Sequence, residues 1–172
     1  MELPQVIEKV LPAFERYYTV KKVSDPPFCA EAEFRSHNEQ YFLVRSARIA
    51  DIDSNEFVYF ASIENLNLQN LQNLTQLAWE KGLSKVKPHN GHRNSDVTLI
   101  IIAEEVDDAA KEAIRKTKLY KSYKMSFWGW SNFKLAVVAV GKQAENQLEN
   151  HGIYYNRFGK DYRKLLEKNI FV

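Results

Sequence analysis

Two uninterrupted apolar runs constrain the fold of this chain more than any other feature of its sequence. Residues 99–103 read Leu-Ile-Ile-Ile-Ala, and residues 135–140 read Leu-Ala-Val-Val-Ala-Val. A strand with one wet face alternates apolar and polar side chains, whereas continuous runs are typical of strands buried on both faces. The sequence therefore predicts a central sheet that helices cover.

Length and composition favour one packed domain over residues 1–172. The chain is 45% hydrophobic and 13% aromatic, which is typical of a globular core rather than of disorder. Six glycines and five prolines in 172 residues exclude a low-complexity chain. No stretch has the composition of a linker, so we expect a single globular domain.

Amphipathic segments predict the helices around this sheet. The first begins at Pro4, and Pro12 should kink it or start a second short helix. Another is capped by Asn65 or Asn67 and ends at Gly82 in a left-handed C-cap. Two more are predicted, one after Asp107 and one at the C-terminus. The apolar face of the first helix is Val6, Ile7, Val10, Leu11, Phe14 and Tyr18. That of the second is Leu71, Leu74, Leu77 and Ala78. That of the last is Tyr162, Leu165, Leu166 and Ile170.

Strand-like runs fill the intervals between these helices. Residues 29–36, 41–50 and 56–63 are separated by short polar segments, which predicts an antiparallel meander over about residues 29–63. Residues 120–130 and 133–140 predict a hairpin that turns at Ser131-Asn132, and a short polar helix is expected over residues 143–150. The predicted order α-β-β-β-α-β-α-β-β-α indicates an α+β or mixed α/β fold. Its sheet is mixed, and helices cover at least one face.

The sequence predicts a cytoplasmic protein without a membrane partner. Cys29 is the only cysteine, so no intramolecular disulfide forms. The N-terminus lacks the basic flank and apolar core of a signal peptide, and no run of about 18 apolar residues exists to span a membrane.

Familiar catalytic and cofactor motifs are missing from the sequence. There is no Gly-x-Ser-x-Gly elbow, no Walker loop and no dinucleotide fingerprint. His89 and His92 are candidate metal ligands three residues apart, with Asp96, Cys29 and His37 as further donors. Their spacing fits no standard zinc motif, so a polar surface loop is the favoured interpretation and no cofactor is assigned.

The element order α-β-β-β-α-β over about residues 5–103 resembles the core of the restriction-endonuclease-like superfamily. This resemblance implies Mg²⁺ held by an acidic residue on one strand and by a Glu-x-Lys or Asp-x-Lys pair on the next. No acidic residue of the meander is followed two positions later by lysine. A nuclease-like hydrolase is therefore the alternative function, and carboxylates such as Glu33, Asp51 and Glu64 in one concave pocket would mark it. The available carboxylates are Glu31, Glu33, Asp51, Asp53 and Glu56.

A basic, aromatic segment over residues 111–134 is the main binding candidate. It carries seven basic residues against one acidic residue, Glu112, although the whole chain has a net charge of only +2. Lysines can follow phosphates while aromatic rings stack on bases. The candidate nucleic-acid contacts are Lys116, Lys118, Lys121, Lys124, Trp128, Trp130 and Lys134.

The same aromatics have a plainer interpretation, which we favour from sequence alone. Tyr123, Phe127 and the two tryptophans would fill the core, with Lys121 and Lys124 as charges on a sheet edge. The function expected from sequence is thus a binding or interaction module, with nucleic acid as the candidate partner.

The C-terminal helix is the candidate surface for self-association. It is followed by Phe171 and Val172, and an apolar terminal helix needs a surface to pack on. Packing within the chain is the favoured interpretation, and a homodimer through this helix is the alternative.

Overall fold

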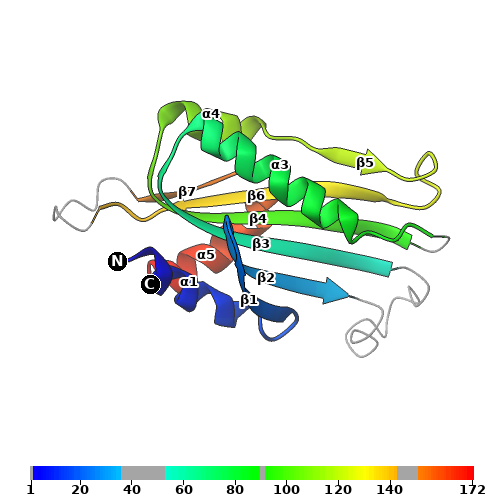
Figure 1. The fold of residues 1–172 in the computed structure, drawn as a ribbon, viewed down its shortest axis with the longest axis horizontal. Helices are drawn as coiled ribbons and strands as arrows, with labels where there is room; N and C mark the ends of the chain where they lie inside the picture. The colour runs from blue at the N-terminus through cyan, green and yellow to red at the C-terminus, as the bar shows by residue number, and fades with distance from the viewer. Residues whose placement is uncertain (1, 36–52, 90–91, 143–150) are drawn as a thin grey trace.

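A computed structural model describes residues 2–35, 53–89, 92–142 and 151–172, without the side chains of residues 53, 92 and 93. Figure 1 shows a twisted sheet between two layers of helices. Its elements are α1 (Leu3–Val10), β1 (Thr19–Asp25), β2 (Phe28–Arg35), β3 (Asp53–Leu66), α3 (Leu68–Ser84), β4 (His92–Val106), α4 (Asp108–Lys116), β5 (Tyr120–Ser122), β6 (Trp130–Ala139), β7 (Gly152–Tyr155) and α5 (Arg163–Ile170).

The sheet is mixed, and in the described part of the chain it has seven strands in the order β1-β2-β3-β4-β6-β5, with β7 also paired to β6. Strands β1, β2 and β3 form an antiparallel meander. Strands β3, β4 and β6 run parallel to one another, and β5 and β7 are antiparallel to β6. The predicted mixed sheet and element order are confirmed, with β1 and β7 as strands that were not predicted.

The meander differs from the prediction in its first strand. Predicted runs 29–36 and 56–63 correspond to β2 and β3, whereas predicted strand 41–50 and predicted helix 143–150 lie outside the described residues. Strand β1 was missed because it is an edge strand whose only partly buried side chains are Val20 and Val23. Such a strand lacks the apolar alternation by which strands are recognised.

The two continuous apolar runs form the centre of the sheet. Leu99 and Ile101 pack under α3 and α4, whereas Ile100 and Ile102 pack under α1 and α5 on the opposite face. All four are 0% exposed. A strand that meets helices on both faces needs an apolar side chain at every position, which confirms the prediction from residues 99–103.

Two predicted features of the helices are confirmed. Helix α1 ends at Val10, and Pro12 lies in the first turn of a separate 3₁₀ helix, where its missing N–H is not needed. The side chain of Asn67 caps α3 by accepting a hydrogen bond from the Asn70 N–H at 2.8 Å.

Gly82 does not end α3, so the predicted glycine C-cap was wrong. The helix continues to Ser84, and its C-cap, Lys85, has right-handed backbone angles. Gly82 is required for packing instead, because a Cβ atom built on it would lie 2.4 Å from Cγ2 of Val97. The missing side chain allows α3 to approach β4 closely.

Replacing Gly82 by alanine is therefore expected to destabilise the protein, although alanine is favoured by about 1 kcal/mol within an exposed helix. The added methyl group overpacks the contact with Val97, which should lower the free energy of unfolding by about 1–3 kcal/mol. Urea unfolding measures the change. Gly82→Ala should cost clearly less when Val97 is also alanine, and a stabilised single variant would contradict the packing role.

The predicted turn at Ser131-Asn132 was also wrong, because both residues lie within β6. The chain turns over residues 123–129, where Trp128 N–H donates to the Tyr123 carbonyl at 3.1 Å. Lys124, Met125 and Ser126 have φ angles of 46°, 52° and 72°. Left-handed angles are uncommon for such residues, so these three gave no signal of the turn, whereas Gly129, with a φ of 86°, could have marked it.

The C-terminal helix α5 packs within the chain. Leu166 and Ile170 are buried in the core that α5 shares with α1. Self-association through this helix stays a prediction. Among the described helices, none is long and apolar enough to cross a membrane.

Candidate functional site

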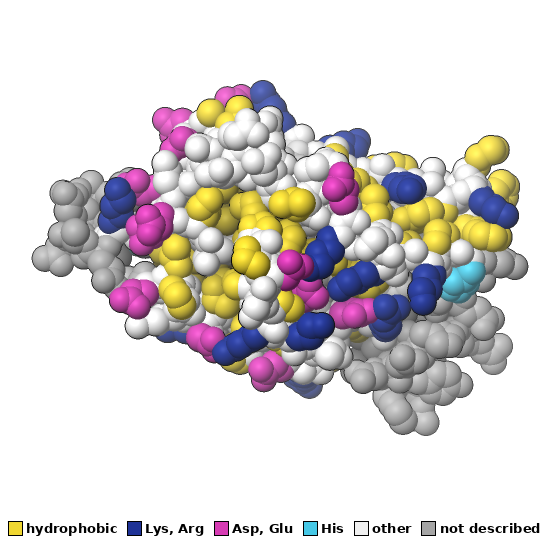
Figure 2. Space-filling model, in the orientation of Figure 1, with side chains coloured by type: hydrophobic (Ala, Val, Ile, Leu, Met, Phe, Trp, Pro, Cys, Tyr) yellow, Lys and Arg dark blue, Asp and Glu magenta, His cyan; other side chains and the backbone are white. Residues whose placement is uncertain are grey.

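A hairpin arm, residues 118–130, protrudes at the end of the sheet where the parallel strands begin (Figure 1). It consists of Lys118 and Leu119, strand β5, the turn and the start of β6. Three large apolar side chains on it are exposed: Tyr120 by 53%, Met125 by 86% and Phe127 by 79%. In Figure 2 hydrophobic atoms stand beside lysines and arginines at this end.

Lysines surround these apolar side chains. Lys118, Lys121 and Lys124 are exposed, and no acidic residue occurs between positions 116 and 134. The Lys124 ammonium lies 3.7 Å from the centre of the Trp128 ring, and that of Lys121 lies 5.7 Å from the Tyr123 ring. These cation–π contacts hold positive charge against the arm.

The arm brings together only part of the predicted nucleic-acid contacts. Lys116 belongs to α4 and pairs with Glu112 at 2.9 Å. Lys134 points away from the arm, into a buried cluster described below. Trp130 is half-buried in β6, and one face of the half-buried Trp128 is covered by Lys124.

The open aromatic rings are Tyr120 and Phe127, which were absent from the predicted contacts. The core interpretation favoured from sequence was therefore wrong for Phe127, whereas Tyr123, Trp128 and Trp130 are half-buried. Aromatic composition alone cannot distinguish a ring at a hairpin tip from one under a helix.

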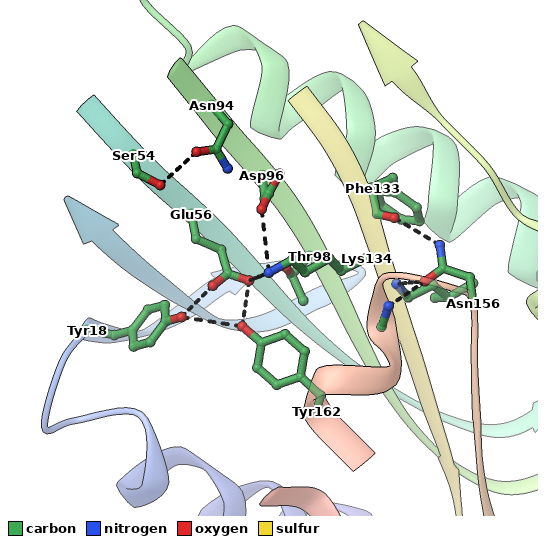
Figure 3. A network of polar contacts seen from close by, with 12 residues as sticks. Tyr18, Ser54, Glu56, Asn94, Asp96, Thr98, Phe133, Lys134, Asn156 and Tyr162 are labelled. Atoms are coloured by element: carbon green, nitrogen blue, oxygen red, sulfur yellow. Dashed lines mark hydrogen bonds and ion pairs between the residues drawn. The ribbon is translucent and has the colours of Figure 1, made fainter. Parts of the chain in front are cut away.

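A polar cluster lies on the face of the sheet that α1 and α5 cover (Figure 3). Parallel pairing places Glu56 of β3 beside Asp96 of β4, and Thr98 of β4 beside Lys134 of β6. Tyr18 reaches the cluster from the segment before β1, and Tyr162 from the turn before α5. The polar cluster is Tyr18, Glu56, Asp96, Thr98, Lys134 and Tyr162.

Glu56 is the centre of this cluster and is 7% exposed. Its Oε2 accepts hydrogen bonds from the Tyr162 and Thr98 hydroxyls, each at 2.5 Å, and its Oε1 accepts one from Tyr18. The Lys134 ammonium lies 3.7 Å from Glu56 Oε2. Every oxygen of this buried carboxylate is thus engaged.

Burial and neighbouring charges shift the pKa values of Lys134 and Asp96. Burial lowers the pKa of Lys134, but Glu56 and Asp96 outweigh burial, so its pKa lies above the usual value. Burial raises the pKa of Asp96, and Lys134, at 3.4 Å from Asp96 Oδ2, offsets only part of that rise. Asp96 Oδ1 is buried without a hydrogen-bond partner in the described part of the chain.

The cluster anchors the helical layer to the sheet. Tyr18 follows the first helical segment, Tyr162 precedes α5, and both donate to the same carboxylate. Burial, with the Glu56 charge second, raises the pKa of both phenols, so each keeps its donor proton at neutral pH. The polar cluster is therefore a structural hydrogen-bond network, in which Asp96 Oδ1 is the carboxylate oxygen without a described hydrogen-bond partner.

The carboxylates of the nuclease interpretation that the structure describes do not converge. Glu31 lies across the sheet from the polar cluster, where it pairs with Lys81 at 2.7 Å and Lys85 at 3.4 Å. Glu64 is exposed near the opposite end of β3 from Glu56. Asp51 and the side chain of Asp53 lie outside the described residues.

Glu31 is expected to make stability depend on pH. Burial raises the pKa of Glu31, but Lys81 and Lys85 lower it by more than burial raises it. The pKa therefore lies below the ordinary value of 4.5. A carboxyl with a lowered folded-state pKa adds stability above the ordinary pKa, and this stability is lost on acidification. Glu31→Gln should therefore cost about 1 kcal/mol at pH 7 and much less near pH 3. Urea unfolding at both pH values, with exposed Glu15→Gln as control, checks this; equal losses at both pH values would contradict it.

The metal interpretation of His89 and His92 gains nothing from the structure. His89 is exposed, and the side chain of His92 and all of His37 lie outside the described residues. The Cys29 thiol donates to the Phe60 carbonyl at 3.4 Å. Within the described ranges, no three histidine, cysteine or acidic side chains gather as metal ligands.

Comparison with known proteins gives one match. Neither the curated proteins nor the solved structures contain a protein that the chain matches. Residues 3–168 match the model of a family described as Domain of unknown function (DUF8052). Because this match covers nearly the whole sequence, the chain belongs to that family.

Proposed function

We propose that this protein binds nucleic acid through its hairpin arm. The observation that carries the proposal is the exposure of Tyr120 and Phe127 among the lysines of a segment without acidic residues. Exposed rings can stack on bases for about 1–3 kcal/mol each. Ammonium groups beside them can neutralise phosphates whatever the base sequence.

The number of exposed lysines predicts how salt affects binding. If Lys118, Lys121 and Lys124 each neutralise one phosphate of a duplex, log affinity falls with log salt at a slope of about −2.7. Raising the salt from about 50 to about 200 mM should then weaken binding by about 40-fold. A partner recognised by apolar contacts alone would show almost no salt dependence.

Fluorescence anisotropy with labelled single- and double-stranded oligonucleotides at those two salt concentrations tests the proposal. Replacing the three lysines of the arm by glutamine should weaken binding and flatten the salt dependence. The matched control replaces Lys160, Lys164 and Lys168, three exposed lysines near or in α5, by glutamine. Absence of binding by the unmodified protein, or an equal loss in both triple variants, would overturn the proposal.

The nuclease alternative is not supported by the geometry of the polar cluster. Hydroxyl donors and Lys134 already engage Glu56, so Asp96 alone has an oxygen to offer a cation. Repeating the titration with Mg²⁺ keeps that alternative testable, because cleavage would lower the anisotropy of the label with time.

A further inference from the structure

We propose that Met125 and Phe127 form an apolar wedge that inserts between stacked base pairs of a duplex. This inference rests on the proposed function and names both the partner and the mode of contact. Proteins that kink duplexes commonly insert phenylalanine or methionine at a base step, with cationic side chains on the flanking phosphates. The hairpin arm presents both kinds of side chain at its tip.

Exposure singles out the two wedge residues. Met125 and Phe127 are 86% and 79% exposed, and only Val172, the last residue, is a more exposed large apolar side chain in the described part of the chain. Isolated exposed apolar side chains are ordinary, but this pair is separated by one residue at the tip of a protruding arm. A contiguous apolar tip with basic neighbours is typical of an interaction site.

The backbone of the turn is arranged in advance of any contact. Lys124, Met125 and Ser126 are consecutive left-handed residues, a conformation that is costly for residues other than glycine. Backbone hydrogen bonds close the turn: Phe127 N–H to the Lys124 carbonyl at 3.0 Å, and Gly129 N–H to the Ser126 carbonyl at 3.2 Å. A tip held in this way does not need to be ordered on insertion, which favours a wedge over a flexible loop.

Charge complements this apolar tip. Lys121 and Lys124 hold their charges over the Tyr123 and Trp128 rings of the same arm, close in sequence to the tip, and can contact the phosphates that flank an opened base step. The protruding shape also favours a duplex over a single strand, since single strands are usually held along basic grooves. Two hollows of the described surface lie elsewhere, one beside α3 at Leu74 and Leu77 and the other at the start of α4.

An anionic lipid surface is the other partner that lysines and apolar side chains can recognise. Even one myristoyl chain gives only marginal membrane attachment, and two side chains bury less apolar surface than that. Insertion at a base step, in contrast, needs only one or two such side chains. The size of the tip therefore favours the duplex.

The test uses the full chain and a duplex of about 25 base pairs that carries a donor and an acceptor dye at its ends, a length within the range of sites that proteins bend. Binding of the unmodified protein should raise energy transfer between the dyes, because a wedge kinks the duplex. The variant Met125→Ser/Phe127→Ser should bind more weakly, because the Phe127 ring is lost, but with the same salt dependence, and at saturating protein it should lose most of that rise. The control Leu68→Gln/Leu77→Gln, which changes two exposed leucines on α3, should behave like the unmodified protein.

Each outcome separates the two proposals. Salt-dependent binding without a change in energy transfer, or with the same change in the wedge variant, would overturn the wedge and leave the proposed function standing. No binding to any oligonucleotide would overturn both. Vesicles of phosphatidylcholine with phosphatidylserine, in a sedimentation assay, complete the design: retention on them without duplex binding would replace nucleic acid by a lipid surface.

Discussion

Asn156→Ala is expected to lower the free energy of unfolding by about 4 kcal/mol or more. Asn156 is 2% exposed, and its side chain makes four hydrogen bonds (Figure 3). Oδ1 accepts from the N–H groups of Leu135 and Gly159 at 3.0 and 2.8 Å. Nδ2 donates to the carbonyls of Phe133 and Thr117 at 2.9 and 3.1 Å.

This asparagine joins three segments that the sheet alone does not connect. It links β6 to the residue that follows α4 and to the turn before α5. Alanine would leave two buried donors and two acceptors without partners, and each such group costs about 1–3 kcal/mol. Gly159 packs closely at this junction, because a Cβ added to it would lie 2.1 Å from the Leu135 carbonyl oxygen.

Urea unfolding followed by circular dichroism measures this loss. The matched control is Asn169→Ala, which removes one bond within α5, from Asn169 Nδ2 to the Leu165 carbonyl at 2.7 Å. The control should cost about 1 kcal/mol or less. Similar losses for the two asparagines would show that the four-bond junction at Asn156 has no special role.

Glu56→Gln is expected to cost about 3 kcal/mol at neutral pH, within the range measured when one partner of a buried ion pair is removed. Glutamine keeps the size of the side chain but removes the charge that Lys134 faces at 3.7 Å. The amide nitrogen of glutamine also cannot accept a hydrogen bond from a tyrosine or threonine hydroxyl. At least one hydroxyl donor of the cluster therefore loses its acceptor.

A double-mutant cycle separates the charge from the packing. Glu56→Gln should cost less when Lys134 is already methionine, because the partner charge is then absent. Glu64→Gln, on an exposed position of the same strand, should change stability by less than about 0.5 kcal/mol. Equal costs for Glu56→Gln in both backgrounds would mean that the ion pair contributes nothing.

The element order was predictable because it depends on local periodicity. The continuous runs at residues 99–103 and 135–140 require burial on both faces whatever surrounds them. The same local reasoning failed at Gly82, because a glycine needed for a left-handed turn and one needed for close packing look alike in a sequence. Only the position of Val97 distinguishes them.

The candidate sites were less predictable, because contacts between distant residues define them. Glu56, Asp96 and Lys134 lie about 40 residues apart along the chain, and the register of three parallel strands brings them together. Lys134 was predicted as a surface contact because it belongs to the basic, aromatic segment 111–134. In the structure, its side chain on β6 faces the carboxylates of Glu56 and Asp96. The exposed tip of the arm is formed by Met125 and Phe127.

The amino-acid sequence was sufficient to predict the buried strands, the helices that flank them and the basic, aromatic character of the arm. These follow from periodicity and composition, which any short window of the chain contains. Three features depend on the tertiary structure. They are the aromatic rings that face solvent, the position of Lys134 between two carboxylates, and the close approach of α3 to β4 at Gly82. Exposure and ion pairing depend on what another segment places opposite a side chain, and strand register determines that across the whole fold.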